Sequence, residues 1–428
     1  MSKVLREERL IYVDNIEKNS NKFWHGTLYE NDDLYVEWGR VGANGQSKTH
    51  SGAGEGKLDK LLKSKLKKGY THQRTVSGTK GGDKAGAKPV GNLTQLAVDQ
   101  IDTSCKETND LVRYLSKVNI HNITSNANIT YDAVTGVFST PLGVITQDGL
   151  DEARVLLGKI SGYVAKDTIT SKPYLTLCGD YMRIIPTDIG MKKFSPRRDM
   201  GTLEHMRQQN DLLDSLATAL DQVADARKKQ DKKAKRSAPK VFDVSLHLVA
   251  DKKVVGPLEK LYKSTLQGRH ACAHLKIKKV YAVSITAMAE AFEADGRKVG
   301  KIMRLWHGTR AANLLSILKS GFYIPPSNAA HCTGRMFGNG VYFSDQSTKS
   351  LNYAYGYWGG AKDSSCFMFL NEVAMGKHYV PKSYSERLPK AGYDSTFAKA
   401  NKSGVMNNEM IVYRTGQINP MYLIQFGN

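Results

Sequence analysis

The sequence predicts a multidomain α+β protein: a small antiparallel sheet with one helix, an all-α bundle, and a mixed α/β domain that is mainly antiparallel. Three patterns carry this prediction. Apolar and polar residues alternate over residues 9–50, and apolar residues recur with helical spacing over 93–227. Short β-rich segments separated by Gly, Pro and Asn return from Val241 onward. The predicted parts are residues 1–76, a linker over 77–91, residues 92–230 and residues 238–428.

The first domain is predicted from strand-like runs and one basic helix. The runs near Leu10, over 23–29 and over 34–38 are separated by the turn-forming strings NSN and ENDD. In the following GKLDKLLKSKLKK, the leucines fall on one helical face and lysines cover the rest. The next string, SGTKGGDKAGAKPVG, has almost nothing to bury, so we expect it to be a flexible linker.

The second domain is predicted to be all-helical. Helical spacing is clear in LTQLAVDQI, NDLVRYLSKV, DGLDEARVLLGKISGYV and LEHMRQQNDLLDSLATAL. Its end is marked by RKKQDKKAKRS, where the basic residues from Arg227 to Arg236 face one acid, Asp231. This run fits a nuclear-localisation signal, a contact to a nucleic-acid backbone or a solvated tether, and the tether is the default interpretation.

The charge balance favours a polyanionic partner. Lys and Arg number 62 against 41 Asp and Glu, which gives a net charge of +21. Charge of this size repels itself in a compact monomer unless a polyanion lies close by. An even distribution would merely keep the protein soluble, but here the basic residues are clustered. Nucleic acid is therefore the first candidate.

Cysteine usage and hydropathy indicate the cellular compartment in which the protein is expected. The five cysteines form no C-x-x-C pair, so neither a disulfide framework nor a Cys-rich zinc site is indicated. His270, Cys272 and His274 alternate as if along one strand face, but no fourth ligand is evident and we expect no metal. The N-terminus lacks the apolar core of a signal peptide, and no run of about eighteen apolar residues occurs. We expect a soluble, intracellular monomer without membrane association.

Two polar residues stand at predicted strand ends in the third domain. In RLWHGTRAANLLSILKSGF a strand delivers His307 and Gly308, and a helix then begins near Ala311. A polar side chain beside a glycine can bond a ligand while bare backbone approaches it closely. In NNEMIVY, Glu409 begins an apolar strand, so its carboxylate is expected where core meets cleft.

Aromatic residues lie between these two motifs. In TGRMFGNGVYFSDQSTKSLNYA, Gly338 and Gly340 form a tight turn into a strand that carries Tyr342. Ser350 and Tyr353 follow on a predicted helix. Aromatic rings next to glycine and hydroxyl groups suit a flat ligand ring.

These three motifs, HGTRAAN, GRMFGNGVYFSDQSTKSLNYA and NNEMIVY, resemble the signatures of the poly(ADP-ribose) polymerase catalytic domain. The His-Tyr-Glu set of that family matches His307, Tyr342 and Glu409. The resemblance implies that NAD is the substrate and that no cofactor is permanently bound. The NAD-binding residues that it implies are His307, Gly308, Arg310, Asn313, Tyr342, Ser350 and Tyr353.

The resemblance also implies how the NAD site is divided. His307 would hold the ribose on the adenine side, and the Gly308 backbone would pair with the nicotinamide carboxamide. Ser350 would bond the same amide. Tyr342 and Tyr353 would sandwich the nicotinamide ring, with offset stacking worth about 0.5–1.5 kcal/mol beyond area burial.

The catalytic role falls to Glu409. Departure of nicotinamide leaves oxocarbenium-like charge on the ribose, which a carboxylate stabilises. In the family this Glu also polarises the acceptor hydroxyl for chain elongation, and Lys349 matches a lysine that assists. Arg335 and Asn407 depart from the Tyr and the aromatic residue that are common at these positions on the acceptor side. They leave acceptor choice and chain length open.

The rest of the chain resembles the other modules of DNA-break-dependent members of this family. The string VEWGRVGANGQ is similar to the WGR module, and its Trp38 and Arg40 would help to engage a DNA end and relay to the catalytic part. On its own, Trp38 would pass for a core aromatic of a small sheet. Residues 140–160 and 181–193 are similar to the regulatory helical domain, which keeps NAD out until DNA binding loosens it. The layout is that of short members without zinc fingers.

Together these features predict a DNA-stimulated poly(ADP-ribose) polymerase. Its partners would be NAD, DNA ends or nicks, and protein acceptors including itself. The expected location is the nucleus in a eukaryote, or the cytoplasm or nucleoid in a bacterial or phage-encoded protein. A mono-ADP-ribosyltransferase remains open, as does a DNA-end-binding protein whose NAD-binding fold is not catalytic.

Overall fold

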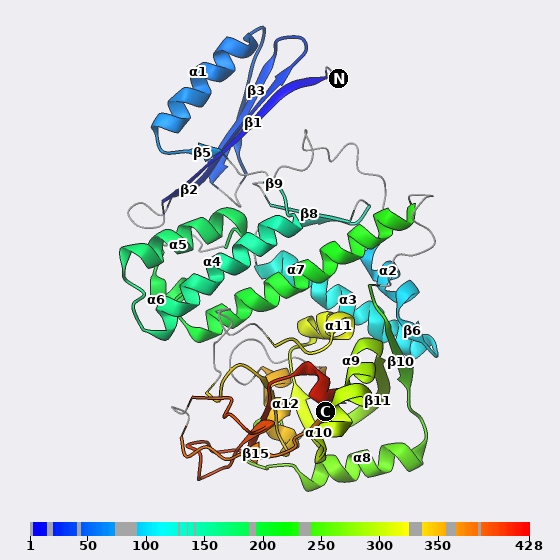
Figure 1. The fold of residues 1–428 in the computed structure, drawn as a ribbon. Coiled ribbons are helices and arrows are strands. Elements are labelled where there is room, and N and C mark those ends of the chain that lie inside the picture. The colour runs from blue at the N-terminus through cyan, green and yellow to red at the C-terminus, as the bar shows by residue number, and fades with distance from the viewer. Residues whose placement is uncertain are drawn as a thin grey trace. The chain divides into compact units, whose positions relative to one another are not determined.

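The computed structural model consists of two compact units, which are described separately (Figure 1). The first comprises residues 1–91 and 121–220, and the second 92–120 and 221–428. The described residues are 3–14, 20–40, 44–72, 92–126, 129–134, 136–140, 143–187, 194–230, 241–324, 336–356, 365–383 and 387–428. The predicted linker over 77–91, most of the basic run that begins at Arg227, and Arg335 lie outside these residues.

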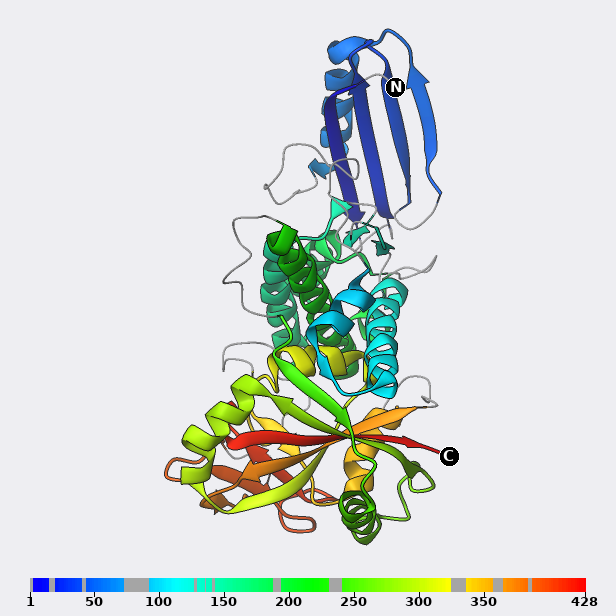
Figure 2. The same ribbon diagram turned by 90° about the vertical axis from the view of Figure 1, so that its right-hand side faces the viewer.

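The first unit begins with the predicted antiparallel sheet. Its strands, in spatial order, are β4 (Gln46–His50), β3 (Leu34–Arg40), β2 (Ser20–Tyr29), β1 (Val4–Asp14) and β5 (Thr71–His72). Helix α1 (Gly54–Lys67) lies along one face of this sheet (Figure 2). Leu58 and Leu62 of α1 pack against Leu10 and Trp24, while most of its lysines are exposed. The sheet and the basic helix are confirmed.

Helices make up most of the remaining first unit. They are α4 (Gln147–Ala165), α5 (Lys172–Ile184), α6 (Pro196–Asp199) and parts of α3 (Lys106–Asn126) and α7 (Leu203–Gln230). The Thr146 hydroxyl accepts from the Gly149 N–H and so caps α4. Buried Tyr181 donates its hydroxyl hydrogen to Gln209 at 2.7 Å, which ties α5 to α7.

The prediction that this region is all-helical was wrong over residues 130–144. A three-stranded antiparallel sheet occupies this segment, with β7 (Thr130–Asp132), β8 (Val137–Thr140) and β9 (Gly143–Val144). Gly136 has a positive φ of 68°, which suits the turn between β7 and β8. Phe138 is fully buried and stacks on Tyr131 at 4.8 Å. Strands this short carry too few residues for alternation to stand out from helical spacing.

The second unit is built on a six-stranded sheet. Its order is β12 (Ile302–Gly308), β14 (Cys366–Ala374), β18 (Ile418–Gly427), β11 (Lys276–Ile285), β10 (Val244–Leu248) and β6 (Asp102–Thr103). All neighbours are antiparallel except β10 and β6. The helical elements are α8 (Lys252–Ser264), α9 (Thr286–Ala291), the π-helix η1 (Phe292–Gly296), α10 (Arg297–Val299), α11 (Ala311–Ser320), α12 (Ser347–Tyr355) and η2 (Thr415–Gln417).

A second sheet of four strands carries part of the site. Its order is β13 (Val341–Phe343), β17 (Glu409–Val412), β16 (Ser395–Ala398) and β15 (His378–Tyr379). Its register aligns one residue from each strand in a row: Tyr342, Ile411, Thr396 and Tyr379. Residues in such a row share a face of the sheet. The mainly antiparallel mixed architecture is therefore confirmed for this part of the chain.

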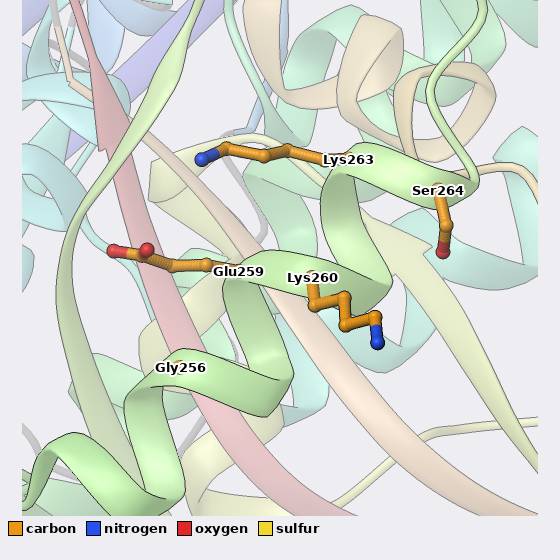
Figure 3. Close-up of a pocket in the computed structure, with 5 residues that line it drawn as sticks. All are labelled: Gly256, Glu259, Lys260, Lys263 and Ser264. Carbon is orange, nitrogen blue, oxygen red and sulfur yellow. The ribbon is translucent and has the colours of Figure 1, made fainter.

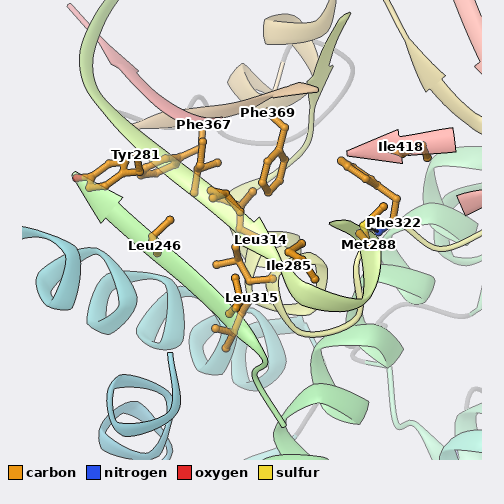
Figure 4. Packing of buried hydrophobic residues seen from close by; sticks show 14 of the residues in the cluster. Leu246, Tyr281, Ile285, Met288, Leu314, Leu315, Phe322, Phe367, Phe369 and Ile418 are labelled. Atoms are coloured by element: carbon orange, nitrogen blue, oxygen red, sulfur yellow. Dashed lines mark hydrogen bonds between the residues drawn. The ribbon is translucent and has the colours of Figure 1, made fainter. Parts of the chain in front are cut away.

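The core of the second unit joins the first sheet to α11. Leu314 and Leu315 of α11 meet Tyr281 and Phe369 from the sheet, as Figure 4 shows. Burial of each such side chain contributes about 1.5–3 kcal/mol. This packing fixes α11 against the end of β12, where His307 stands.

Residues of the predicted regulatory region also belong to this unit. Helix α2 (Leu93–Gln100) and the first part of α3 contribute to the same core. Asn119 of α3 donates its amide to the Ala312 carbonyl at 3.5 Å, and Asp221 of α7 forms an ion pair with Lys319 of α11. The regulatory helices thus touch the helix that directly follows the HGT motif.

Candidate active site

His307 is held as a neutral imidazole. Its Nδ1 lies 2.9 Å from the Tyr342 carbonyl, and because a carbonyl only accepts, Nδ1 carries the proton. Its ring stands edge-on to Phe322, with centroids 4.7 Å apart. Burial lowers the pKa of His307 to about 4; the bond to Tyr342 opposes this, and the Lys349 charge adds to it. Nε2 is then an acceptor, suited to a hydroxyl donor such as ribose.

Gly308 brings β12 against α12. A Cβ at this position would lie 1.8 Å from the Ser350 carbonyl oxygen, so only glycine fits. The Ser350 hydroxyl donates to the Trp306 carbonyl at 2.9 Å and keeps lone pairs that can accept from an amide. The structure therefore places Gly308 beside Ser350.

Tyr342 and Tyr353 come from different elements. The Tyr342 hydroxyl donates to the Gly338 carbonyl and accepts from the Phe337 N–H, both at 2.9 Å. These bonds fix the phenol end of the Tyr342 side chain on β13. Tyr353 is on α12, and the Lys349 Nζ lies 5.5 Å from its ring centroid.

Lys349 and Glu409 form the ionic centre of the site. The Lys349 Nζ is 2.8 Å from Glu409 Oε1, and the side chains are 10% and 14% exposed. A charge-assisted hydrogen bond of this length is strong, and this one is largely shielded from solvent. Lys349 lies on α12 and Glu409 is the first residue of β17. The fold therefore brings together two predicted catalytic residues that are far apart in sequence.

Arg310 and Asn313 lie at the start of α11. Arg310 occupies the N-cap position of this helix. Asn313 donates its amide to the Thr309 hydroxyl at 3.1 Å, while its buried Oδ1 has no partner in the described part of the chain. An amide oxygen in this position can accept a hydrogen bond from a ligand. Its place on the HGT segment suits a hydrogen-bond donor of NAD.

Sequence reasoning missed contacts made by Arg269 and His270 to residues that neighbour Glu409 and Lys349 in the chain. Arg269 donates to the Asn407 side chain at 2.6 Å and to the Met406 carbonyl at 3.2 Å. The His270 Nδ1 lies 2.8 Å from the Thr348 hydroxyl, directly before Lys349. No local motif announces these contacts, because the partners are 78 to 138 residues apart.

The predicted strand face for His270, Cys272 and His274 is wrong. These residues lie in turns before β11, because the strand begins only at Lys276. Cys272 is buried and its thiol approaches the Thr348 carbonyl at 3.3 Å. Alternation over five residues resembles a strand even where backbone turns intervene.

Trp38 and Arg40 lie at the end of β3 in the first unit. Trp38 pairs with Trp24 across the strands and is half-buried against the core beneath α1. The interpretation as a core aromatic is therefore partly right. Arg40 pairs in register with Lys22 at the last position of the strand. Both side chains of the WGR string point to the α1 side of the sheet, since they are two residues apart.

A shallow hollow on α8 holds none of the predicted site residues. It is lined by Gly256, Glu259, Lys260, Lys263 and Ser264 (Figure 3). These side chains spread along an exposed helix and converge on no common point.

None of the helices in the described residues is long and apolar enough to cross a membrane.

The neutral state of His307 predicts a pH dependence. Its folded pKa of about 4 lies below the ordinary 6.5, so between these values the unfolded chain binds the extra proton. Stability from this group is therefore full above pH 6.5 and falls as the pH drops toward 4, by about 1.4 kcal/mol per pKa unit at most. In urea unfolding followed between pH 7 and 4.5, His307→Gln should flatten this loss. The control His121→Gln, at an exposed position on α3, should leave the slope as it is; equal slopes in all three proteins would contradict the prediction.

Comparisons with known proteins cover most of the chain. The WGR domain model matches residues 7–77, the poly(ADP-ribose) polymerase regulatory domain residues 91–241, and the poly(ADP-ribose) polymerase catalytic domain residues 255–428. Poly [ADP-ribose] polymerase 2 of Zea mays is 26% identical over 96% of this chain and 68% of its own length. Human protein mono-ADP-ribosyltransferase PARP3 is 26% identical over 90% of this chain and 75% of its own length.

A shorter match has higher identity. Poly [ADP-ribose] polymerase 1 of Arabidopsis thaliana is 31% identical over a match that covers 39% of this chain and 20% of that protein. The three family models follow one another in the order that the motifs predicted, and the catalytic match contains His307, Tyr342 and Glu409. The chain therefore belongs to the poly(ADP-ribose) polymerase family, the NAD-dependent ADP-ribosyltransferases with this catalytic domain.

Proposed function

We propose that this chain is a poly(ADP-ribose) polymerase that DNA strand breaks stimulate. It splits NAD, releases nicotinamide, attaches ADP-ribose to protein acceptors including itself, and extends the first unit to a polymer. The observation that carries the proposal is the solvent-shielded Lys349–Glu409 pair in the site that also holds His307 and Tyr342. We also propose that it acts as a monomer, in the nucleus if the host is eukaryotic, with the domain boundaries given above.

The reaction assigns a task to each side chain. His307 Nε2 accepts from the adenine-side ribose, and the Gly308 backbone and Ser350 hold the carboxamide. The rings of Tyr342 and Tyr353 stack on the nicotinamide ring. The bond from ribose C1′ to the nicotinamide nitrogen breaks, and the electron pair leaves with nicotinamide. Glu409 stabilises the developing positive charge, then takes a share of the acceptor hydroxyl proton as the new C1′–O bond forms. Lys349 holds the carboxylate in place.

DNA dependence is proposed from the first unit. A basic α1 and the Trp38 and Arg40 positions fit a phosphate backbone and an exposed base end. The contacts of α3 and α7 with α11 give a route from regulatory helices to the HGT segment. Loosening these contacts would open the NAD site.

We expect nicotinamide release to rise when nicked or blunt-ended duplex is added. Arg40→Ala should remove most of the stimulation and leave the rate without DNA unchanged, because Arg40 belongs to the first unit and the catalytic motifs belong to the second. Release is measured with labelled NAD, with and without broken DNA. Arg197→Ala removes the same charge from α6 and is the control. Equal release with and without DNA would remove the regulatory proposal and leave the chemistry.

A mono-ADP-ribosyltransferase is the second candidate, because Asn407 is held by Arg269 where many members carry an aromatic residue. The similarity of this chain to human protein mono-ADP-ribosyltransferase PARP3 supports this alternative. A denaturing gel of the labelled product separates the two, since polymer gives a smear and single transfer gives a sharp band. A DNA-end-binding protein without catalysis would release no nicotinamide above background.

A further inference from the structure

Four residues at the edge of the four-stranded sheet form a basic and aromatic surface. They are Lys377, Tyr379, Lys390 and Tyr393, here called the β15 surface (β15 is labelled in Figure 1). The Lys377 Nζ lies 4.8 Å from the Tyr393 ring centroid, and the Lys390 Nζ lies 5.5 Å from that of Tyr379. The two tyrosine rings are 5.2 Å apart. Each ring therefore has a cation beside it.

The charge of this surface is not neutralised within the described chain. Lys377, Lys390 and Tyr393 are exposed, and no described carboxylate forms an ion pair with either ammonium group. The nearby Asp394 is engaged by Arg414 at 3.5 Å and by the Lys377 backbone N–H. Cation–π contacts at exposed sites are weak, so the lysines can swing from the rings to a stronger anion.

The β15 surface shares a sheet face with the active site. Tyr379, Thr396, Ile411 and Tyr342 form one row across the sheet. Glu409 lies two residues before Ile411 on β17 and so has the same orientation. Three strand spacings of about 4.8 Å separate Tyr379 from Tyr342, so the surface begins about 14 Å from the active-site tyrosine.

We propose that the β15 surface binds an ADP-ribose unit of the growing polymer after it has left the catalytic centre. The adenine ring would stack on Tyr393 or Tyr379, and the pyrophosphate would lie between Lys377 and Lys390. Aromatic rings with adjacent cations suit a ligand that repeats bases and phosphates. This inference rests on the proposed polymer synthesis and names where its product is retained.

Single-stranded nucleic acid carries similar groups, but the position of the surface favours the polymer. A unit bound here lies about 14 Å along the same sheet from Tyr342, so the end of a chain held at this surface stays within reach of the next transfer. Retention of this kind favours long chains, because a product that stays bound is extended before it is released. The chemistry alone would accept either polyanion, so the experiment includes both.

The test measures binding on the full chain without NAD, so that no transfer occurs. Labelled poly(ADP-ribose) of one length and an oligo(dA) strand of similar charge are titrated by fluorescence anisotropy. We expect Lys377→Ala/Lys390→Ala to weaken polymer binding about tenfold or more and to lower the salt slope by about 0.7 for each lost phosphate contact. Tyr393→Ala should cost about tenfold from lost stacking, and Tyr393→Phe should restore it.

Controls separate this surface from charge in general. Lys276→Ala/Lys278→Ala removes two exposed lysines from β11 and should leave polymer affinity within about twofold, since neither has an aromatic partner at this surface. Unchanged polymer affinity in Lys377→Ala/Lys390→Ala would overturn the inference. So would an equal loss for oligo(dA), which would mark the surface as a nucleic-acid site.

The binding assay is independent of the proposed activity. If wild-type protein makes only single transfers, polymer synthesis fails, while binding of added polymer still decides the inference. If it makes polymer, Lys377→Ala/Lys390→Ala should shorten the chains at an unchanged initial rate of nicotinamide release. Full-length chains from this variant, despite lost binding, would refute the role in retention.

Discussion

Replacing Glu409 with glutamine is expected to lower nicotinamide release by about 10²- to 10³-fold and to abolish polymer, while NAD binds almost as before. Glutamine keeps the shape of the side chain but carries no charge to face the ribose as nicotinamide departs. The loss falls on the transition state, so kcat should drop and KM should change little. Labelled NAD on a denaturing gel and NAD binding by calorimetry measure the two effects.

Removing the Glu409 charge also breaks the Lys349–Glu409 pair, so a loss of stability must be separated from the loss of catalysis. Glu409→Gln leaves the Lys349 ammonium without its carboxylate at a position that is largely shielded from solvent. The change therefore costs stability as well as catalysis. Thermal unfolding of the variant separates the two losses. Glu372→Gln removes a carboxylate from β14, where Asn419 donates to it at 3.3 Å, and should keep activity within about twofold. Unchanged polymer length in Glu409→Gln would refute the assigned role.

Local sequence patterns predicted the elements that hold the site. The helix predicted near Ala311 begins at that residue, and Ser350 and Tyr353 lie on α12 as expected. Glu409 begins β17. Each of these features depends on residues only a few positions apart, such as a glycine at a turn or an apolar run at a strand. Pattern reasoning works at this range because the backbone preferences are local.

The contacts between segments were beyond the same reasoning. Arg269 reaches Asn407 across 138 residues, and Lys349 meets Glu409 from another element. Such pairs depend on how a turn, a helix and a strand are stacked by the shared core, which no local spacing encodes. The strands β7 to β9 were missed for a different reason: a short hairpin inside a helical region offers too few alternating residues.

The residue with the tightest steric requirement in the site is Gly308, and Gly308→Ala is expected to abolish NAD turnover. Its new Cβ would lie 1.8 Å from the Ser350 carbonyl oxygen and 2.6 Å from the carbonyl carbon. Both neighbours are backbone atoms of α12, so no side-chain rotation relieves the overlap. β12 is also fixed, since Gly308 pairs with Met368 on β14 and Trp306 is buried.

The remaining response to Gly308→Ala is a shift of α12 away from β12, which moves Lys349, Ser350 and Tyr353 together. Overpacking of this kind costs about 1–3 kcal/mol or more of stability. Lost alignment by about 1 Å costs a further factor of about 10² in rate. Gly162→Ala is the matched control, because a Cβ there meets nothing within 4 Å and alanine favours the interior of α4. Activity and thermal unfolding of both variants test the argument: a Gly308→Ala protein that keeps wild-type turnover would show that α12 can yield without disturbing the Lys349–Glu409 pair.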